Sequence, residues 1–437
     1  MRIPATALVI LLAATTASGH GTPPMTTDVR FTTSDPKTIL VGSTIGLLLT
    51  RDGGCTVEWI CESNVGYGPT YQPKYAFAAD GSILATTFLG LRISRDGGCN
   101  FTTATAALPV TDPNRIADMW IDALDVGPMG EIWVGTSENG RSNDIFVSID
   151  NGETFTPRGL MSTTVAYKSV KVAPSDATRV YVTGAAATTA QLYRSDATGW
   201  ITLPATGIAV GAVPRLEIAV VDPNDRDTLY VISRAVAAPR DDRLYRSSDG
   251  GMTFVEVLVP SAKIHDVTVR DAQTVYVTTM VLHVTGNFDL GGPTFVSTDG
   301  GKLFGLLDGA PQLACLSIAP DGTPVGCGWN WEPDFKAIAS LDGNVWNKLW
   351  RFVEIAGPIA CPADSGNSAC DREWTQLEID LGVTGPTCGP HASSDAGIDI
   401  PPPPPPPGCC SVNGGGSLGL VWAVAIAWRL RRRRRRR

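Results

Sequence analysis

Ser247-Ser-Asp-Gly-Gly-Met-Thr-Phe254 is the clearest of seven copies of one short motif in this chain of 437 residues. The other copies are Thr50–Val57, Ser94–Phe101, Ser148–Phe155, Arg194–Trp200, Ser297–Phe304 and Ser340–Trp346. Successive copies begin 43 to 54 residues apart, a repeat length typical of propeller blades or solenoid turns. One structural unit, used seven times, therefore accounts for most of the chain.

Each repeat carries the same predicted elements around the motif. In the fifth repeat an apolar strand at 216–221 precedes a turn, and a second strand at 228–233 is rich in β-branched and aromatic residues. A polar loop leads to a third strand at 243–246, the motif and a fourth strand at 253–258. Four short strands joined by turns form one antiparallel sheet.

Seven such sheets predict an all-β fold, a seven-bladed β-propeller of four-stranded antiparallel blades at residues 28–352. The first strands of the other six repeats are expected to begin near Val29, Tyr75, Ile121, Val170, Val267 and Leu316. Residues 353–390 contain further cysteines and are expected to form a short disulfide-stapled extension.

The pattern Ser-x-Asp-x-Gly-x-Thr-Trp/Phe resembles the Asp-box, or bacterial neuraminidase repeat, of sialidases, sortilin-type receptors, xyloglucanases and a photosystem assembly factor. Five copies match well, and the resemblance covers about three quarters of the chain. It implies the propeller fold and leaves the function open, since one fold hosts many functions. The aspartates are expected to accept backbone N–H bonds within turns whose glycines take positive φ. These structural residues are Asp52, Asp96, Asp150, Asp249 and Asp299.

Catalytic signals are sparse. The expected mature chain has no Arg-Ile-Pro motif and no evident arginine triad with a Tyr-Glu pair, as a sialidase would have. His265 and His283 have no Ser or Cys nucleophile motif around them. A glycosidase needs two carboxylates, and the available candidates are Asp122, Glu217, Asp266, Glu332 and Asp334. No catalytic residue, metal or cofactor is predicted.

The two ends of the chain differ from its middle. Residues 1–19 combine Arg2, an apolar run and a small-residue end, which is typical of a secretory signal peptide. Outside the ends the chain has 26 basic and 43 acidic residues, a difference of 17. Phosphate repels so acidic a surface, which argues against a nucleic-acid partner.

The C-terminal part is a spacer followed by a membrane-type segment. Residues 391–408 are polar and end in seven prolines, whereas 409–437 hold Cys409, Cys410, an apolar run and an arginine cluster. This tail resembles the sorting signals of myxobacterial surface proteins, which implies processing or lipid attachment at one of the two cysteines. The alternative is a plain single-pass anchor with its arginines in the cytoplasm. Both predict export, either to the surface or outer membrane of a Gram-negative bacterium or as a membrane-anchored protein.

Ten cysteines suit an exported protein, in which disulfides persist. Cys315 and Cys327 are expected to pair across a hairpin that turns at 321–322. Cys361 and Cys370 are expected to form a small loop staple.

Loop length separates the two faces of the predicted ring. The turns between first and second strands and the seven motif turns are short and lie together on one face, the short-turn face. The blade-to-blade crossovers and the second-to-third-strand loops lie on the opposite, long-loop face. The long loops are 63–74, 136–144, 233–243, 279–293 and 328–336. Because long and varied loops concentrate where ligands bind, a binding site is predicted on the long-loop face.

The candidate ligand-binding residues are aromatic or charged. Trp329 and Trp331 are expected to form a sugar-stacking platform, with packing of one tryptophan beneath the loop as the alternative; Tyr71 is a second aromatic candidate under the same alternative. The full set is Trp329, Trp331, Glu332, Asp334, Tyr71 and Arg215. Further charged residues lie near the starts of first strands, and some of them are expected to line the channel, either for a ligand or for water: Lys168, Lys171, Glu217, His265 and Asp266.

The sequence thus predicts an exported, non-catalytic surface propeller that binds an extracellular glycan or protein as a monomer. A glycoside hydrolase on the same scaffold is the first alternative, and a protein assembly factor is the second.

Overall fold

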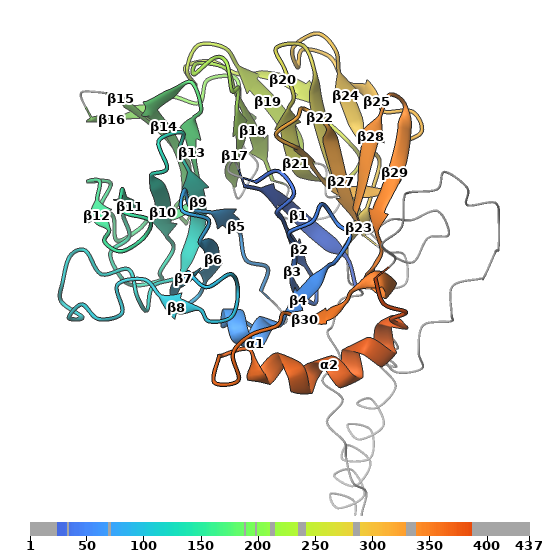
Figure 1. Cartoon of the computed structure of the whole chain (residues 1–437). Coiled ribbons are helices and arrows are strands. Elements are labelled where there is room, and N and C mark those ends of the chain that lie inside the picture. The colour runs from blue at the N-terminus through green and yellow to red at the C-terminus, as the bar shows by residue number, and fades with distance from the viewer. Residues whose placement is uncertain are drawn as a thin grey trace, which may run out of the picture. The chain divides into compact units, whose positions relative to one another are not determined.

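The computed structural model describes residues 24–386 except 33–34, 69–70, 188, 197–198, 210–214, 235–241, 283–288 and 329–337. The described chain forms seven antiparallel sheets around a central axis, the blades of a propeller (Figure 1). The fold predicted from the repeat is therefore confirmed.

The strands follow the chain blade by blade. Blade 1 has β1 (Thr26–Phe31), β2 (Ile39–Ser43), β3 (Gly46–Thr50) and β4 (Glu58–Ile60), and blade 2 has β5 (Tyr75–Phe77), β6 (Ile83–Thr87), β7 (Gly90–Ser94) and β8 (Thr102–Thr103). Blade 3 has β9 (Ile121–Val126), β10 (Ile132–Thr136), β11 (Ile145–Ser148) and β12 (Thr156–Pro157), and blade 4 has β13 (Ala166–Ala173), β14 (Asp176–Ala185), β15 (Ala190–Asp196) and β16 (Gly199–Leu203).

The remaining three blades repeat the pattern. Blade 5 has β17 (Leu216–Val221), β18 (Leu229–Ser233), β19 (Arg243–Ser247) and β20 (Val255–Leu258). Blade 6 has β21 (Lys263–Val269), β22 (Val275–Leu282), β24 (Phe295–Ser297) and β25 (Gly305–Leu306), with β23 (Asp289–Gly291) paired to β22. Blade 7 has β26 (Leu313–Ile318), β27 (Pro324–Gly328), β28 (Ile338–Asp342) and β29 (Val345–Trp350).

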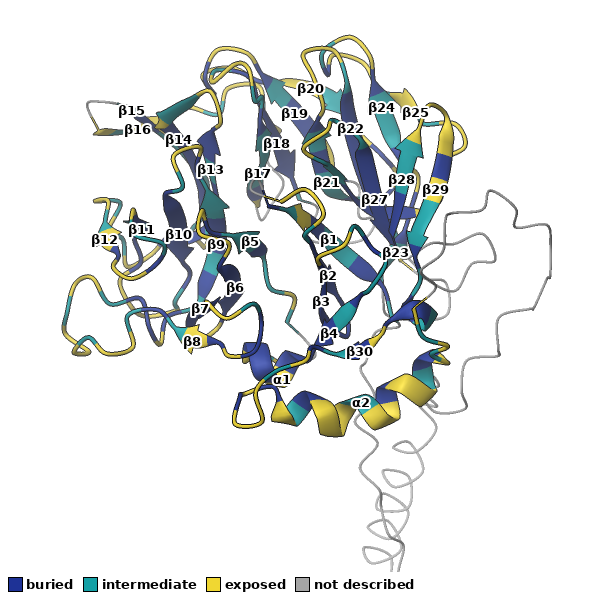
Figure 2. Ribbon diagram, viewed as in Figure 1, coloured by how far each residue is buried: buried dark blue, intermediate teal, exposed yellow. Residues whose placement is uncertain are grey.

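The second strand of each blade is nearly all buried, because it lies inside its own sheet and packs against both neighbouring blades (Figure 2). Such strands are continuous apolar runs, as in Ile39-Leu-Val-Gly-Ser43. First strands of neighbouring blades contact each other, and β1 of blade 1 contacts β26 of blade 7, which closes the ring. At this closure the Thr26 hydroxyl donates to the Gly328 carbonyl at 3.1 Å and accepts from the Gly328 N–H at 2.6 Å.

The turns between third and fourth strands share one hydrogen-bond pattern. In blade 5 the Asp249 carboxylate accepts the Ser247 hydroxyl at 2.8 Å and the Thr253 N–H at 2.9 Å. The same serine accepts the Gly251 N–H at 2.9 Å, and Gly250 and Gly251 have φ of 70° and 84°. The carboxylate thus closes the turn, and corresponding bonds are formed by Asp52, Asp96, Asp150 and Asp299.

First strands carry an irregularity that the sequence analysis did not predict. One extra residue interrupts the pairing with the second strand in six of the seven blades, at Thr27, Asp122, Lys168, Ala219, His265 and Ala314. Such a β-bulge reverses the in-and-out alternation of side chains beyond it. The predicted first strands of blades 1, 4, 6 and 7 begin three or four residues too late, whereas those of blades 2, 3 and 5 begin at the observed residue.

The extension after blade 7 folds back along blade 1. A single 3₁₀ turn, η1 (Phe352–Glu354), leads to β30 (Gly357–Pro358), which pairs in parallel with β4, and then to helix α2 (Ser368–Leu381). Leu377 and Leu381 of this helix join the same buried cluster as Trp59 of blade 1. The helix was not predicted, and neither was the one-turn helix α1 (Glu62–Val65) beside it.

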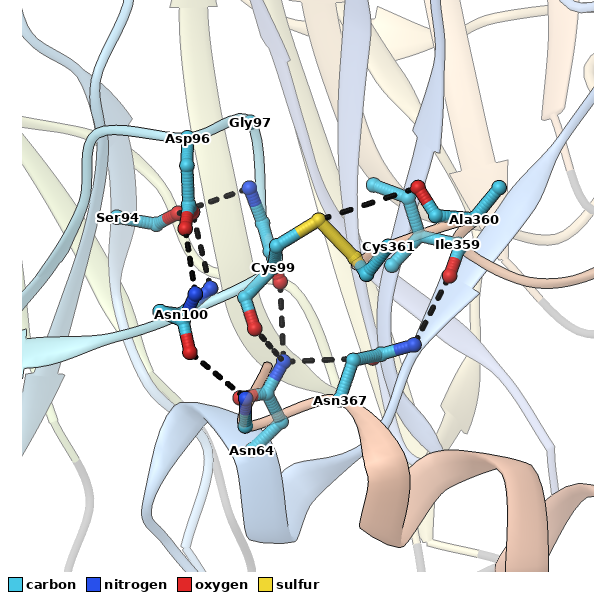
Figure 3. The surroundings of a disulfide bond; sticks show 12 residues. Asn64, Ser94, Asp96, Gly97, Cys99, Asn100, Ile359, Ala360, Cys361 and Asn367 are labelled. Carbon is cyan, nitrogen blue, oxygen red and sulfur yellow. Dashed lines mark hydrogen bonds between the residues drawn. A yellow bond between two sulfur atoms is a disulfide. The ribbon is translucent and has the colours of Figure 1, made fainter. Parts of the chain in front are cut away.

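Two disulfides fix the extension to the first two blades. Cys61 of blade 1 pairs with Cys370, and Cys99 of blade 2 pairs with Cys361. Figure 3 shows the second bond beside Asn64, whose side-chain amide donates to the Cys99 carbonyl at 3.3 Å.

The predicted Cys361–Cys370 pair is wrong, because each of these cysteines reaches a blade more than 250 residues away in sequence. Cys315 and Cys327 do form a bond across their hairpin, as their opposed positions on β26 and β27 require. Cys55 is disulfide-bonded as well.

Among the helices of the described residues, none has the length and apolar character to cross a bilayer. The predicted signal peptide, proline spacer and C-terminal span all lie outside the described residues.

Candidate functional site

A cavity of about 890 Å³ occupies the centre of the ring. Residues of the first strands of blades 1 to 6 line it, from Lys74 at the crossover into blade 2 to Met129 at the short turn of blade 3. Its volume lies within the range of about 300–1,000 Å³ typical of ligand pockets. The cavity therefore passes from the long-loop end of the first strands to their short-turn end.

The bulges decide which side chains face this cavity. A regular strand exposes every second residue to one face, but a bulge brings residues three apart to the same side. Asp122 and Asp125 are both half-buried on β9, and Lys168 and Lys171 are both half-buried on β13, whereas the residues between them are buried. Two charged rows therefore lie side by side on blades 3 and 4.

The two rows pair with each other. The Lys168 ammonium lies 2.7 Å from an Asp122 carboxylate oxygen, and the Lys171 ammonium lies 3.3 Å from Asp125. The other Asp125 oxygen accepts the backbone N–H of Val172 at 2.8 Å. These contacts hold blade 3 to blade 4 and fix both carboxylates in place.

Glu217 of blade 5 is held in the same way. Its carboxylate lies 2.6 Å from the Arg234 guanidinium, which also contacts Asp242 at 2.8 Å. Burial opposes ionisation of Glu217, but the arginine and the nearby Lys74 outweigh it and lower the pKa to about 2. Glu217 is therefore a fixed anion at physiological pH.

Blade 6 contributes two neighbouring residues at its bulge, His265 and Asp266. Burial lowers the pKa of His265 to about 4, helped by the charges of Lys263 and Arg234. Burial raises the pKa of Asp266, opposed by the nearby Arg30. The histidine is therefore neutral at pH 7, and in Asp266, unlike Glu217, the effect of burial prevails and raises the pKa.

An aromatic cluster lies at the long-loop end of the cavity. The Phe88 ring lies 4.5 Å from that of Tyr71 and 5.1 Å from that of Trp120, measured between centroids. The Lys168 ammonium stands 4.5 Å from the centroid of the Trp120 ring, a cation–π contact. The cluster therefore adjoins the charged rows.

Lys74 connects the aromatic cluster to the cavity. Its ammonium donates to the Asp122 carbonyl at 2.7 Å and to the Lys168 carbonyl at 3.0 Å, across blades 2, 3 and 4. The Tyr71 hydroxyl contacts Thr86 at 3.0 Å and donates to the Ile121 carbonyl at 3.2 Å. Both residues serve partly as braces between blades.

The structure brings together part of the predicted site. Tyr71, Lys168, Lys171, Glu217, His265 and Asp266 lie along the cavity or at its long-loop end. Arg215 is exposed just before β17, where its carbonyl accepts the Arg234 N–H at 2.8 Å. Trp329, Trp331, Glu332 and Asp334 lie outside the described residues. No cluster of His, Cys, Asp or Glu suited to a metal ion occurs in the described part of the chain.

Phe88, Trp120 and Arg234 were missed from the sequence. Phe88 and Leu89 form the tip of a two-residue turn between β6 and β7, where apolar side chains are unusual because turn tips face water. The sequence therefore contained a signal for this position, two apolar residues at a turn tip. The position of Arg234 depends on the approach of blades 5 and 6, which no local pattern indicates.

Comparisons with known proteins assign no family to this chain. No protein-family model matches the chain, and no curated protein matches it. Among solved structures, a GH74 xyloglucanase from Xanthomonas campestris is 15% identical over 76% of this chain and 66% of that chain, with a TM-score of 0.40. An ancestral GH74 enzyme is 12% identical, covering 75% and 54%, with a TM-score of 0.44.

The structure described as YCF48 bound to D1 peptide is 14% identical, covering 70% of this chain and 89% of that chain, with a TM-score of 0.44. This chain spans about two thirds of the length of the xyloglucanase and about half of the ancestral enzyme. At these identities and scores, none of the three indicates what this protein binds.

Proposed function

We propose that this protein is an exported, surface-displayed propeller that binds an extracellular glycan or protein without transforming it. The observation that supports this function is the ion pairing of the first-strand carboxylates along the cavity and at its long-loop end. Asp122 is bound to Lys168, Asp125 to Lys171 and Glu217 to Arg234.

Such pairing suits binding better than proton transfer. A general acid must carry a proton near neutral pH, and a general base must present a free carboxylate oxygen to its substrate. Glu217, with its pKa near 2, carries no proton under these conditions. Fixed donors and acceptors held by their own ion pairs instead provide a preorganised polar lining, which lowers the entropic cost of binding.

Export and display rest on the ends of the chain. The disulfides of the described residues agree with an oxidising compartment. In this proposal the signal peptide at 1–19 directs export, and Cys409 or Cys410 is the site of processing or lipid attachment, so that the spacer holds the propeller away from the membrane. The propeller acts as a monomer.

Glycoside hydrolysis is a second candidate, favoured by one residue. Burial raises the pKa of Asp266, the property that a glycosidase requires of its general acid. In that case Asp266 protonates the leaving oxygen and a second carboxylate of the long-loop face completes the pair.

One experiment separates the candidates. The purified protein is applied to a glycan array and to an envelope extract, and the bound glycans are then incubated with it and analysed for cleavage. Saturable binding with unchanged glycans supports the proposal, and retention of one envelope protein instead of a glycan indicates a protein ligand, as for an assembly factor. Release of shorter sugars that Asp266→Asn abolishes would establish the hydrolase.

A further inference from the structure

Blades 1 and 2 use the same turn between their second and third strands. The turns are residues 43–46 and 87–90, each with a hydroxyl residue first and a glycine last. In both, the first hydroxyl donates to the glycine carbonyl at 2.8 Å. It also accepts the N–H of the third residue, at 3.3 Å from Ser43 and at 3.1 Å from Thr87. Both turns lie at the long-loop face, so their tips can be compared directly.

The tip of the blade 1 turn is covered by its own chain. Thr44 and Ile45 are 6% and 1% exposed. Thr44 exchanges hydrogen bonds with the backbone of Met25, and the Trp59 indole donates to the Ile45 carbonyl at 2.6 Å. An apolar tip in this turn is therefore explained by burial.

The tip of the blade 2 turn is open. Phe88 and Leu89 are 49% and 64% exposed, although they occupy the positions that blade 1 buries. A tight turn tip favours polar residues and glycine, because it faces water. Two adjacent large apolar side chains left uncovered at such a tip are free to contact another molecule.

The ring of Phe88 is held in place before any ligand arrives. It packs against Tyr71 and Trp120 in tilted contacts, at centroid distances of 4.5 and 5.1 Å, and stays 49% exposed. Trp120 is in turn covered by the Lys168 ammonium at 4.5 Å. A ring fixed by its neighbours loses little conformational entropy on binding.

Polar groups adjoin this apolar tip. Lys168 and Asp122 form an ion pair at 2.7 Å next to Trp120, and Lys74 donates to the Asp122 carbonyl. The pair offers donors and acceptors together with almost no net charge. Hydroxyl groups, which donate and accept at once, match such a pair better than carboxylates or ammonium groups do.

We infer that Phe88 and Leu89 form a stacking surface for a pyranose ring of a neutral glycan, whose hydroxyls bond to Lys168 and Asp122. A pyranose presents an apolar C–H face and a rim of hydroxyls, which correspond to the two parts of this surface. Acidic glycans are disfavoured because the body of the chain carries 17 more acidic than basic residues. The inference rests on the proposed binding function and assigns its subsite and ligand class.

The test measures affinities of the full-length protein for cellohexaose, laminarihexaose and maltohexaose, with oligogalacturonate as the acidic probe. Phe88→Ala is expected to weaken binding of the preferred neutral hexasaccharide about tenfold, as for aromatic residues at the centre of binding sites. Phe88→Tyr keeps the ring and is expected to bind within about twofold of wild type. Leu303→Ala is the matched control, because Leu303 is 72% exposed in the motif turn of blade 6, on the short-turn face, and it should bind like wild type.

The outcomes distinguish this inference from the proposed function. If wild type binds a hexasaccharide and Phe88→Ala binds it equally well, the subsite is wrong and the binding function stands. If oligogalacturonate binds better than every neutral probe, the ligand class is wrong. If no oligosaccharide binds while an envelope protein is retained, the inference fails and the binding function is left with a protein ligand. Equal losses in Phe88→Ala and Phe88→Tyr would also contradict ring stacking.

Discussion

The His265 Nε2 atom lies 2.9 Å from the carbonyl oxygen of Thr27, so the first strand of blade 6 reaches that of blade 1 directly. Blade 7 follows blade 6 in the chain, and its bulged residue, Ala314, is buried in one cluster with Met25 and Met280. The bond therefore ties the last blades to the first across the cavity, next to the closure of the ring.

The first prediction concerns pH. Because the pKa of His265 falls from its usual 6.5 to about 4 in the fold, protons bind the unfolded chain more tightly. The fold therefore loses no stability through protonation of this group well above pH 6.5, and it loses stability progressively as the pH drops from 6.5 towards 4. Between pH 7 and pH 4.5 the loss is about 2 kcal/mol. Urea unfolding at a series of pH values measures it.

His265→Gln is the matched variant, because glutamine can donate to the Thr27 carbonyl and does not titrate. The stability difference between wild type and variant should shift towards the variant by about 2 kcal/mol between pH 7 and pH 4.5. Other groups that titrate in this window contribute to both proteins and largely cancel. A pH-independent difference would show that His265 is not buried in its neutral form.

The second prediction concerns the repeated turns. Asp249→Asn removes the charge from a carboxylate that accepts the Ser247 hydroxyl and two backbone N–H groups. We expect a loss of about 1–2 kcal/mol, seen as a fall of a few degrees in Tm, with ligand affinity unchanged. Ser248→Ala, at an exposed position of the same turn, is the control and should unfold at the wild-type temperature. Weaker ligand binding by a fully folded Asp249→Asn would place the motif in the binding site.

The repeat was sufficient to predict the propeller fold, but it did not predict which side chains face the cavity. A period of two would place Asp122 and Leu124 on one side of β9, whereas the bulge places Asp122 with Asp125. The same spacing of three recurs in Lys168 and Lys171. Charged residues three apart in a predicted first strand are therefore a usable signal for a bulge in this fold.

The disulfides between the extension and the first two blades could not be predicted, for a different reason. Cys361 and Cys370 were predicted to pair because they are near in sequence. Their actual partners depend on where the extension crosses blades 1 and 2. Helix α2 has a narrow buried side, chiefly Cys370, Leu377 and Leu381, and so a weak apolar pattern. When a contact depends on how two distant segments dock, the sequence of neither segment contains a pattern that identifies its partner.

The third prediction concerns the extension. Replacing both Cys61 and Cys370 by serine is expected to lower the free energy of unfolding by about 2–4 kcal/mol, because the bond closes a long path through the chain. The matched control replaces Cys315 and Cys327, which are only 12 residues apart and should cost less. Denaturant unfolding under non-reducing conditions compares the two, and limited proteolysis should cut the extension only in the first variant. Equal losses would show that the extension adds no constraint to the ring.

The last prediction concerns the contact between α1 and α2. Glu62 is 8% exposed, and burial together with the nearby charge of Glu373 raises its pKa to about 7. The folded protein holds this proton more tightly than the unfolded chain does, whose carboxyl has a pKa of about 4.5. The stability that results is fully present below pH 4.5 and is lost as the pH rises through 7. Wild type should therefore lose up to about 3 kcal/mol from this group between pH 4.5 and pH 8.

Glu62→Gln keeps the shape of the neutral carboxyl and cannot ionise, so the variant should become more stable than wild type as the pH rises to 8, relative to their difference at pH 4.5. Glu373→Gln should produce a smaller gain, because it removes only the repulsion and leaves Glu62 buried. Its amide oxygen can still accept the Ser63 hydroxyl bond, which is 2.7 Å long in wild type. Parallel stability curves for wild type and Glu62→Gln across this range would show that the pKa of Glu62 is not raised in the fold. Water would then reach Glu62 in the contact between the two helices.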